Sequence, residues 1–235
     1  MEAIILAGGL GKRLRGVVND VPKPMADILG KPFLEYIMEY LKKNNVKKVI
    51  LAIGYKGHVI KDYFGGDYKG ISIMYSEEME PLGTGGGIKQ AIRLCENENN
   101  IIINGDTYFD VDLPEMMKQH IMTKSDLTIA TKVMYDFDRY GIVVSDKDKR
   151  IIEFKEKKYY NQGNINGGVY ICKKELVDEV TENSFSFEKE VLEKKYKIKK
   201  FSSFISESYF IDIGIPNDYF SFKNYIESIK INGEK

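Results

Sequence analysis

The stretch that decides the fold is residues 4–14, which read IILAGGLGKRL. Residues 4–7 are apolar and include β-branched isoleucines, which predicts a buried strand of a parallel sheet. Glycines and cations follow this strand directly, at Gly8, Gly9, Gly11, Lys12 and Arg13. Bare backbone N–H groups beside positive side chains make an anion site, and phosphates are the anions that fit it best. A tight turn alone would need a single glycine.

Two better-known glycine motifs do not fit this stretch. A Walker A loop requires glycine where Leu6 stands and serine or threonine where Arg13 stands. A dinucleotide-binding fingerprint requires glycine or alanine where Leu14 stands. The next apolar run, residues 49–54, also ends without the acid that would hold a ribose. The sequence therefore predicts a phosphate site of another kind.

Helical and strand patterns alternate through the first half of the chain. Pro32 opens a predicted helix whose inner face carries Leu34, Ile37, Met38 and Leu41. Strands are predicted at residues 49–53 and 71–75, with a short helix at 59–64 between them. This alternation indicates a parallel sheet with right-handed crossovers, whose ligands bind beyond the carboxyl ends of the strands. The glycine loop lies at that edge.

A second glycine-rich stretch is EEMEPLGTGGGIKQA, residues 77–91. Its second half has the pattern of a helix, with Thr84 as the expected N-cap. Gly85, Gly86 and Gly87 would fill the first turns, and each costs about 1 kcal/mol of helix stability relative to alanine. We therefore expect something to pass close to this backbone. A nucleoside is the favoured interpretation, packing of the helix against the first glycine loop is the alternative, and the two are compatible.

Acidic residues and a change of pattern mark the rest of the chain. Asp106 follows a predicted strand at residues 101–104, where a carboxylate facing the phosphate loop could hold Mg²⁺. Asp112 precedes a helical run and is interpreted as its N-cap.

Beyond residue 125, strands separated by turns predominate, and a helix and a further strand come before the last helix. These are predicted at residues 127–133, 141–145, 150–154, 165–172, 187–196 and 209–213, and from Pro216 onward.

Composition limits the functions that need to be considered. A chain of 235 residues reads as one domain, 1–235, and its 35 basic and 35 acidic residues leave no charge footprint for nucleic acid or an anionic membrane. We expect a cytoplasmic protein with reduced thiols, because it has no apolar run of about 18 residues and only two distant cysteines, Cys95 and Cys172. His58 and His120 stand apart in sequence, which argues against zinc or Ser-His-Asp chemistry.

These motifs together resemble a known family. AGGLGKRL at residues 7–14, followed by PKPM at 22–25 and DIG at 212–214, is similar to the signatures of the sugar-1-phosphate nucleotidyltransferases, over nearly the whole chain. The resemblance implies an α/β protein with a Rossmann-like, mostly parallel sheet flanked by helices and a small β-rich sugar-binding lobe. It implies a nucleotide-binding half, 1–124, and a sugar-phosphate-binding half, 125–235. Lys12 departs from the family, which usually has a small hydroxyl residue there.

The resemblance also implies roles for individual residues. Arg13, with Lys12, would contact the phosphates that leave as pyrophosphate, Lys23 the α-phosphoryl oxygens, and Asp106 and Asp212 the Mg²⁺ ion. Together Arg13, Lys23 and Asp106 form the expected catalytic set. The sugar phosphate would meet Lys157 through its phosphate and Glu156, Asn166 and the Gly141 backbone through its hydroxyls. The expected nucleotide contacts are Leu6, Gly8, Gly9, Gly11, Lys12, Glu80, Gly83 and Thr84.

Within that family, three segments most resemble the guanylyltransferases that act on D-glycero-α-D-manno-heptose 1-phosphate. They are EPLGTGGGI at residues 80–88, FDRYG at 137–141 and YFIDIG at 209–214. Glu80 favours GTP, because guanine offers two adjacent donors to a carboxylate whereas uracil and thymine present one N–H between two carbonyls. Uridylyl-, thymidylyl- and mannose-1-phosphate guanylyltransferases are the alternatives, and the sequence leaves open whether the protein is a monomer or a dimer.

Two readings from other functional classes are weaker. A regulatory subunit that binds nucleotide sugars without making them would be expected to lack Arg13, Lys23 or one of the aspartates, and all of them are present. A glycosyltransferase could use Asp110 and Asp112 as a D-x-D motif, but that would leave Lys23 and Asp212 unexplained.

Overall fold

The computed structural model describes residues 1–9 and 21–233. Within them, the largest sheet has ten strands, and eight of these follow the order β11-β10-β12-β7-β1-β4-β6-β5. Strand β1 (Glu2–Leu6) is parallel to both of its neighbours, β4 (Lys48–Ile53) and β7 (Asn99–Asn104), and β6 (Ile71–Glu77) continues the parallel part beyond β4. The parallel arrangement that the sequence predicts for the first half is therefore confirmed.

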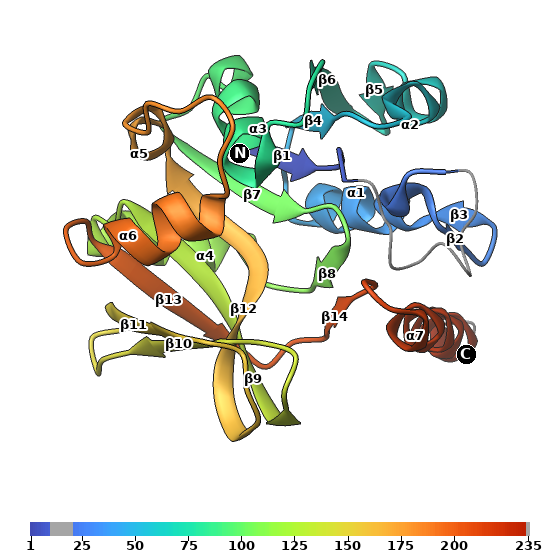
Figure 1. Ribbon diagram of the computed structural model, residues 1–235. Helices are drawn as coiled ribbons and strands as arrows, with labels where there is room; N and C mark the ends of the chain where they lie inside the picture. The colour runs from blue at the N-terminus through green and yellow to red at the C-terminus, as the bar shows by residue number, and fades with distance from the viewer. Residues whose placement is uncertain (10–20, 234–235) are drawn as a thin grey trace.

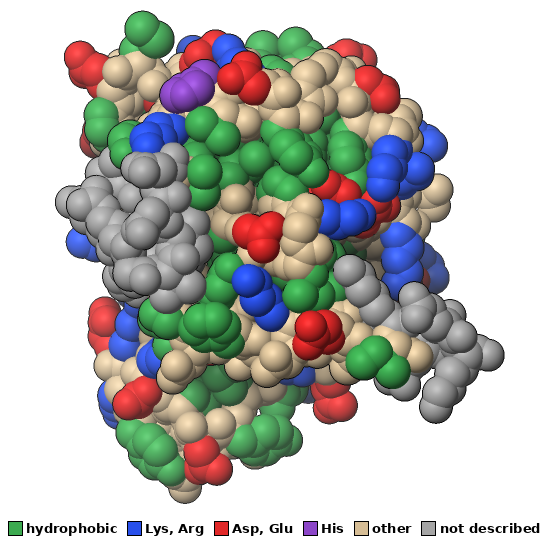
Figure 2. Space-filling view, turned by 90° about the vertical axis from the view of Figure 1, so that its right-hand side faces the viewer, with side chains coloured by type: hydrophobic (Ala, Val, Ile, Leu, Met, Phe, Trp, Pro, Cys, Tyr) green, Lys and Arg blue, Asp and Glu red, His purple; other side chains and the backbone are tan. Residues whose placement is uncertain are grey.

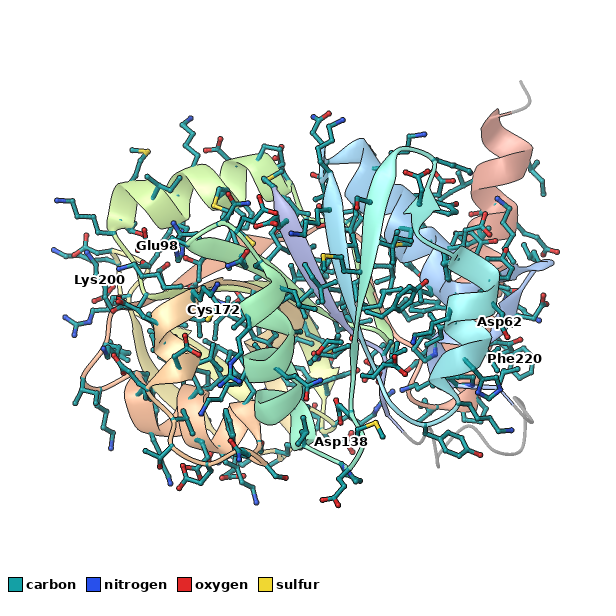
Figure 3. The ribbon with its side chains drawn as sticks, turned by 90° about the horizontal axis from the view of Figure 1, so that it is seen from above. Asp62, Glu98, Asp138, Cys172, Lys200 and Phe220 are labelled. Carbon is teal, nitrogen blue, oxygen red and sulfur yellow. The ribbon has the colours of Figure 1, made fainter. Side chains whose placement is uncertain are left out.

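Helices cover both faces of this sheet, as the view from above in Figure 3 shows. One face packs against α1 (Phe33–Lys43), α2 (Gly57–Phe64) and α4 (Leu113–Thr123), and the other packs against α3 (Gly83–Ala91). Ala3 and Ile5 of β1 point to the first face, whereas Ile4 points to the second. Because the middle of β1, β4 and β7 is buried on both sides, residues 3–6, 49–53 and 101–103 are continuously apolar.

The second half of the chain extends the same sheet. Strand β12 (Tyr160–Lys173) pairs with β7 through residues 169–173 and with β9 (Leu127–Phe137) through residues 160–172. The remaining strands of this part are β10 (Ile142–Ser145), β11 (Ile151–Lys155) and β13 (Phe201–Ser206). Figure 1 shows this β-rich part below and to the left of the parallel strands. The predicted combination of a parallel sheet with a β-rich lobe is confirmed.

Smaller elements complete the chain. Strand β14 (Phe210–Asp212) pairs with β8 (Thr107–Phe109) and leads to the last helix, α7 (Pro216–Gly233), as Figure 1 shows. A π-helical turn, η4 (Glu188–Leu192), continues into α6 (Glu193–Lys195). The other short elements are η2 (Lys23–Met25), β2 (Asp27–Ile28), β3 (Lys31–Pro32), β5 (Asp67–Tyr68), η3 (Ile92–Leu94) and α5 (Lys174–Asp178).

Some details differ from the sequence prediction. Pro32 is the N-cap of α1 and ends β3, so the helix begins one residue later than predicted. Asp112 is confirmed as an N-cap, because its side chain accepts a hydrogen bond of 2.9 Å from the Glu115 N–H. Strand β13 was not predicted, because its sequence FSSFIS has serines where a buried strand normally has apolar residues.

The surface has mixed charge. Figure 2 shows the face that carries α2 and α7, where acidic and basic side chains are interspersed with apolar ones. No single-sign patch dominates that face, which agrees with the balanced composition.

Of the helices in the described part of the chain, none has both the length and the apolar character needed to cross a membrane. Cys95 and Cys172 are buried free thiols, and burial raises the pKa of Cys95 to about 12.

A buried polar network lies between α4, β9 and β13. The His120 ring donates from Nε2 to Asn99 Oδ1 at 3.0 Å and accepts at Nδ1 from the Thr128 hydroxyl at 2.8 Å. Because Asn99 Oδ1 can only accept, the proton of the neutral His120 ring lies on Nε2, and Nδ1 accepts from Thr128, whose hydroxyl also lies 2.9 Å from that of Ser202. The serines of β13 are thus satisfied inside the protein, which is why an unusually polar strand can be buried.

Acid should destabilise the fold through His120. Burial lowers its pKa from 6.5 to about 4, so the unfolded chain binds a proton at pH values where the folded protein does not. The free energy of unfolding should therefore fall as the pH drops from 6.5 toward 4, by on the order of 3 kcal/mol. Denaturant unfolding of wild type and His120→Gln at pH 5 and pH 7.5 measures this. Equal pH dependence in the two proteins would contradict the assignment.

Candidate active site

A cleft of about 1150 Å³ opens at the carboxyl ends of the parallel strands. One wall comes from the loops that follow β1, β4 and β6, with Gly8, Gly54 and Glu78 among its residues. The opposite wall comes from the second half of the chain and includes Asn166 and Asp212. The cleft thus lies where doubly wound sheets bind their ligands, between the two halves that share the sheet.

Three charged side chains meet in this cleft. Lys23 Nζ lies 2.6 Å from Asp106 Oδ2 and 3.7 Å from Asp212 Oδ1. Asp106 follows β7, Asp212 ends β14 and Lys23 begins η2, so the trio joins three distant parts of the chain. Pairing of Asp212 with Thr107 between β14 and β8 brings the two carboxylates together. The sequence predicted all three residues, and the structure places them side by side.

Asp106 and Asp212 together carry more negative charge than the single positive charge of Lys23 can balance. Burial raises the pKa of Asp212, and the neighbouring Asp106 carboxylate raises it further, while Lys23 and a hydrogen bond from the Gly214 N–H act in the opposite direction. Oxygen donors of this kind suit Mg²⁺, which commonly uses one or two carboxylates and completes its shell with waters and substrate phosphates. Within residues 1–9 and 21–233, no cluster of three or more potential metal-ligating side chains occurs. Two carboxylates side by side match the number of protein ligands that Mg²⁺ commonly takes.

The first glycine loop is described in part. Leu6, Gly8 and Gly9 line the cleft, as expected for residues that approach a nucleotide. A Cβ on Gly8 would lie 3.2 Å from the Gly54 backbone nitrogen and 3.3 Å from Glu78 Oε1, so the backbone here is closely packed. Other predicted contacts of this loop lie outside the described residues, namely Gly11, Lys12 and Arg13.

The start of α3 corrects one prediction. Leu82 is the N-cap of this helix, and Thr84 is instead bonded to the second half of the chain: its hydroxyl accepts from the Phe187 N–H at 2.9 Å and donates to Glu188 at 2.8 Å. A Cβ on Gly85 would lie 2.1 Å from the Phe185 ring, and one on Gly86 would lie 2.2 Å from the Asn183 carbonyl. The chain itself fills this space, so packing accounts for these two glycines, and a nucleoside contact with this stretch stays a prediction.

Residues 183–188 therefore form a segment that binds the second glycine-rich stretch to the other half of the protein, and we call it the anchor segment. The Phe185 carbonyl accepts from the Gly85 N–H at 2.9 Å, and the Phe185 N–H donates to the Leu82 carbonyl at 2.9 Å. Gly83, with a φ of +70°, and Thr84 still line the cleft beside it. The small residues of α3 thus serve packing, as the alternative interpretation of the sequence expected. Their partner is the anchor segment and not the first glycine loop.

The predicted sugar-phosphate contacts lie on the opposite wall. Gly141, Lys157 and Asn166 line the cleft, whereas Glu156 is not among its lining residues. The pairing of β12 with β9 shifts in register between Asn166 and Tyr170. Irregularities of this kind redirect side chains near binding sites. Asn166 Nδ2 donates to the Tyr170 hydroxyl at 2.8 Å, and its Oδ1 accepts from the Gly168 N–H at 3.0 Å.

Several residues of the cleft were not predicted as site residues. Glu78 begins the loop after β6, Tyr140 precedes Gly141, and Glu188 begins the π-helical turn. Burial and the neighbouring Asp212 carboxylate raise the pKa of Tyr140 to about 12. A sequence signal existed for Tyr140, because it adjoins a glycine expected in the site. Glu188 gave no such signal, because it opens a charged helical run in which glutamates and lysines follow it.

Comparisons with known proteins agree with this geometry. A family model described as nucleotidyl transferase matches residues 2–229. The chain is 59% identical to the D-glycero-α-D-manno-heptose 1-phosphate guanylyltransferase of Aneurinibacillus thermoaerophilus, over 93% of this chain and 95% of that protein. It is 49% identical to the enzyme of the same name from Campylobacter jejuni, over 94% and 98% of the two chains.

Solved structures give the same picture. HddC from Yersinia pseudotuberculosis, complexed with GMP-PN, superposes with a TM-score of 0.87 at 40% identity, over 96% of this chain and 99% of that chain. A UDP-glucose pyrophosphorylase complexed with UDP-glucose superposes with a TM-score of 0.79 at 18% identity, over 97% and 98% of the two chains, which supports the fold alone. The predicted fold class, that of the nucleotide-diphospho-sugar transferases, is confirmed.

Proposed function

This chain belongs to the nucleotidyl transferase family, and on that premise we propose that it is a sugar-1-phosphate guanylyltransferase. It transfers GMP from GTP to D-glycero-α-D-manno-heptose 1-phosphate and releases pyrophosphate. The observation that carries this proposal is Lys23 between Asp106 and Asp212 in the cleft, because this arrangement suits a phosphate and a divalent cation. The names of the relatives supply the nucleotide and the sugar.

The reaction needs positioning and charge neutralisation more than covalent chemistry. An oxygen of the sugar phosphate forms a bond to the α-phosphorus of GTP, the bond from that phosphorus to the β-phosphate oxygen breaks, and pyrophosphate leaves with the electron pair. Residues 1–124 bind the nucleotide and residues 125–235 bind the sugar phosphate. Lys23 contacts the α-phosphoryl oxygens, and Arg13 with Lys12 contacts the leaving phosphates. Each cation stabilises negative charge that moves in the transition state.

Mg²⁺ is the proposed cofactor. Asp106 and Asp212 would hold it, and when bound it supplies positive charge that screens the phosphates from each other. Asp212 is suited to this role, because burial and the neighbouring carboxylate make its negative charge unfavourable until a cation arrives.

Loss of either carboxylate should remove Mg²⁺-dependent turnover. Asp106→Asn and Asp212→Asn should each lower the rate of pyrophosphate release by about 100-fold or more, because the metal loses an anionic ligand. The rate is measured against Mg²⁺ concentration, with circular dichroism to verify folding. Asp110→Asn is the matched control, since Asp110 follows β8 and is not a lining residue of the cleft. A glycosyltransferase that uses the D-x-D motif would show the opposite ranking.

Lys157 is the proposed ligand of the acceptor phosphate. It is exposed and lines the cleft, whereas Lys155 and Lys158 are not among the lining residues. Lys157→Ala should therefore raise the KM for the heptose 1-phosphate by roughly tenfold and leave the KM for GTP unchanged. Lys155→Ala and Lys158→Ala are the controls. Equal losses in all three variants would indicate a diffuse basic surface instead of a specific contact.

Guanine is the proposed base, and two carboxylates of one loop could contact it. Glu80 is exposed and has no hydrogen bond or ion pair within the described residues. Glu78 is half-buried, accepts from the Leu82 N–H at 3.2 Å and has its other oxygen near Gly8 and Gly87. Burial raises the pKa of Glu78. The freely available acceptor is Glu80, which keeps it the proposed partner of the guanine N1–H and N2–H₂ donors.

Base selection can be tested by comparing variants of this loop. Glu80→Gln should weaken the use of GTP by about 1–3 kcal/mol in kcat/KM, because an amide can turn a donor toward the guanine donors. Glu77→Gln is the control, since Glu77 pairs with Lys61 outside the cleft. A matrix of GTP, UTP and dTTP against heptose and mannose 1-phosphates gives the selectivity. Loss of GTP preference in Glu78→Gln alone would transfer the contact to Glu78, and wild-type preference for UTP would overturn the guanylyltransferase assignment.

A further inference from the structure

Glu188 is a carboxylate in the cleft that the reaction scheme above does not use. It is half-buried, lines the cleft and opens the π-helical turn Glu188–Leu192. Short π-helical turns occur often at functional sites, because the extra residue redirects side chains from an otherwise regular helix. The pattern of residues 187–196 predicts a charged amphipathic helix, and Glu188 is a charged residue of that run that lines the cleft.

Two hydroxyl groups hold the Glu188 carboxylate in place. Its Oε2 accepts from Thr84 Oγ1 and from Ser186 Oγ, each at 2.8 Å. The same Thr84 hydroxyl accepts from the Phe187 N–H, which leaves its single proton for Glu188. Within residues 1–9 and 21–233, no donor contacts the other oxygen, Oε1, and no lysine or arginine forms an ion pair with this side chain. One acceptor atom is therefore fixed and the other is available.

Glu188 lies between Thr84 of the second glycine-rich stretch and residues near the proposed sugar subsite. Tyr170 is only 1% exposed, and its ring packs against that of Phe187, the residue before Glu188, with ring centroids 5.4 Å apart. The Tyr170 hydroxyl accepts from Asn166, a proposed contact of the sugar hydroxyls. Glu188, Tyr170 and Asn166 all line the cleft.

The charge of Glu188 restricts what it can bind. An ionised carboxylate only accepts hydrogen bonds and repels phosphates, so its available oxygen needs a neutral donor. A sugar ring supplies such donors as hydroxyl groups, and the phosphates of both substrates can be held by the lysines elsewhere in the cleft. No cation competes for Oε1 within the described residues, as the ion pairs of the structure indicate.

We propose that Glu188 binds a ring hydroxyl of the sugar 1-phosphate through its Oε1 and so contributes to sugar specificity. This inference rests on the proposed function, and it assigns one binding residue beyond those that the sequence indicated. Ser186 and Thr84 act as positioning residues, because they hold the other oxygen of the same carboxylate.

The test compares Glu188→Gln and Glu188→Ala with Glu190→Gln, a control on the same turn whose side chain pairs with Lys194 and does not line the cleft. KM and kcat are measured for GTP and for D-glycero-α-D-manno-heptose 1-phosphate. Affinity for the sugar phosphate alone is measured by calorimetry. Glu188→Gln should raise the sugar-phosphate KM about tenfold and leave the GTP KM unchanged, because a charge-assisted hydrogen bond becomes a neutral one.

A series of sugar 1-phosphates, each lacking one ring hydroxyl, identifies the donor. The wild-type kcat/KM for one of these analogues should be lower than that for the parent sugar by about tenfold or more. Glu188→Ala should have the same kcat/KM for that analogue and for the parent sugar. Equal rises in both KM values, a rise for GTP alone, or unchanged discrimination among the analogues would overturn the proposal. Two measurements separate the two hypotheses. Absence of wild-type turnover refutes the guanylyltransferase assignment. Calorimetric affinity for the sugar phosphate that is equal in wild type and Glu188→Ala refutes the Glu188 contact.

Discussion

Two like charges held close together are the constraint on which the cleft depends. Asp106 and Asp212 repel each other, and burial adds to the cost of ionising Asp212, while Lys23 offsets part of both effects from 2.6 and 3.7 Å away. A flexible chain would separate such carboxylates. Their closeness therefore requires rigid elements behind each residue, namely the end of β7, the short helix η2 and the β14–β8 pair. An arrangement that is unfavourable alone is suited to a ligand that brings positive charge.

The long strand β12 supplies much of that rigidity. By pairing with β7 at one end and with β9 along its length, it makes one sheet of the two halves of the chain. Its shift in register falls between Asn166 and Tyr170, at the cleft. Regular pairing thus fixes the position of the sugar-facing wall, and the local irregularity aims its side chains. The anchor segment, residues 183–188, makes a second connection by packing on the glycines at the start of α3.

That second connection explains the composition of α3. Three successive glycines weaken a helix, yet side chains at Gly85 and Gly86 would collide with Phe185 and Asn183. The helix therefore gives up intrinsic stability for close contact with the anchor segment. The same contact brings Glu188 beside Thr84, so that a residue of the second half of the chain enters the cleft next to the nucleotide loop.

The sequence by itself determined the β-α-β alternation, the glycine loop after β1 and the positions of Lys23, Asp106 and Asp212. The alternation, the glycine loop and Asp106 could be predicted because the carboxyl ends of parallel strands meet at one edge, so polar residues that follow apolar runs gather there. Lys23 and Asp212 were indicated by the resemblance to the family, since Lys23 begins η2 and Asp212 lies on the antiparallel β14–β8 pair. Only the tertiary structure decided that β13 is a strand, that protein fills the space beside Gly85, that Glu188 enters the cleft and that Glu156 does not line it. Each of these depends on contacts between residues distant in sequence, such as the 104 positions from Thr84 to Glu188, which local periodicity and propensity do not encode.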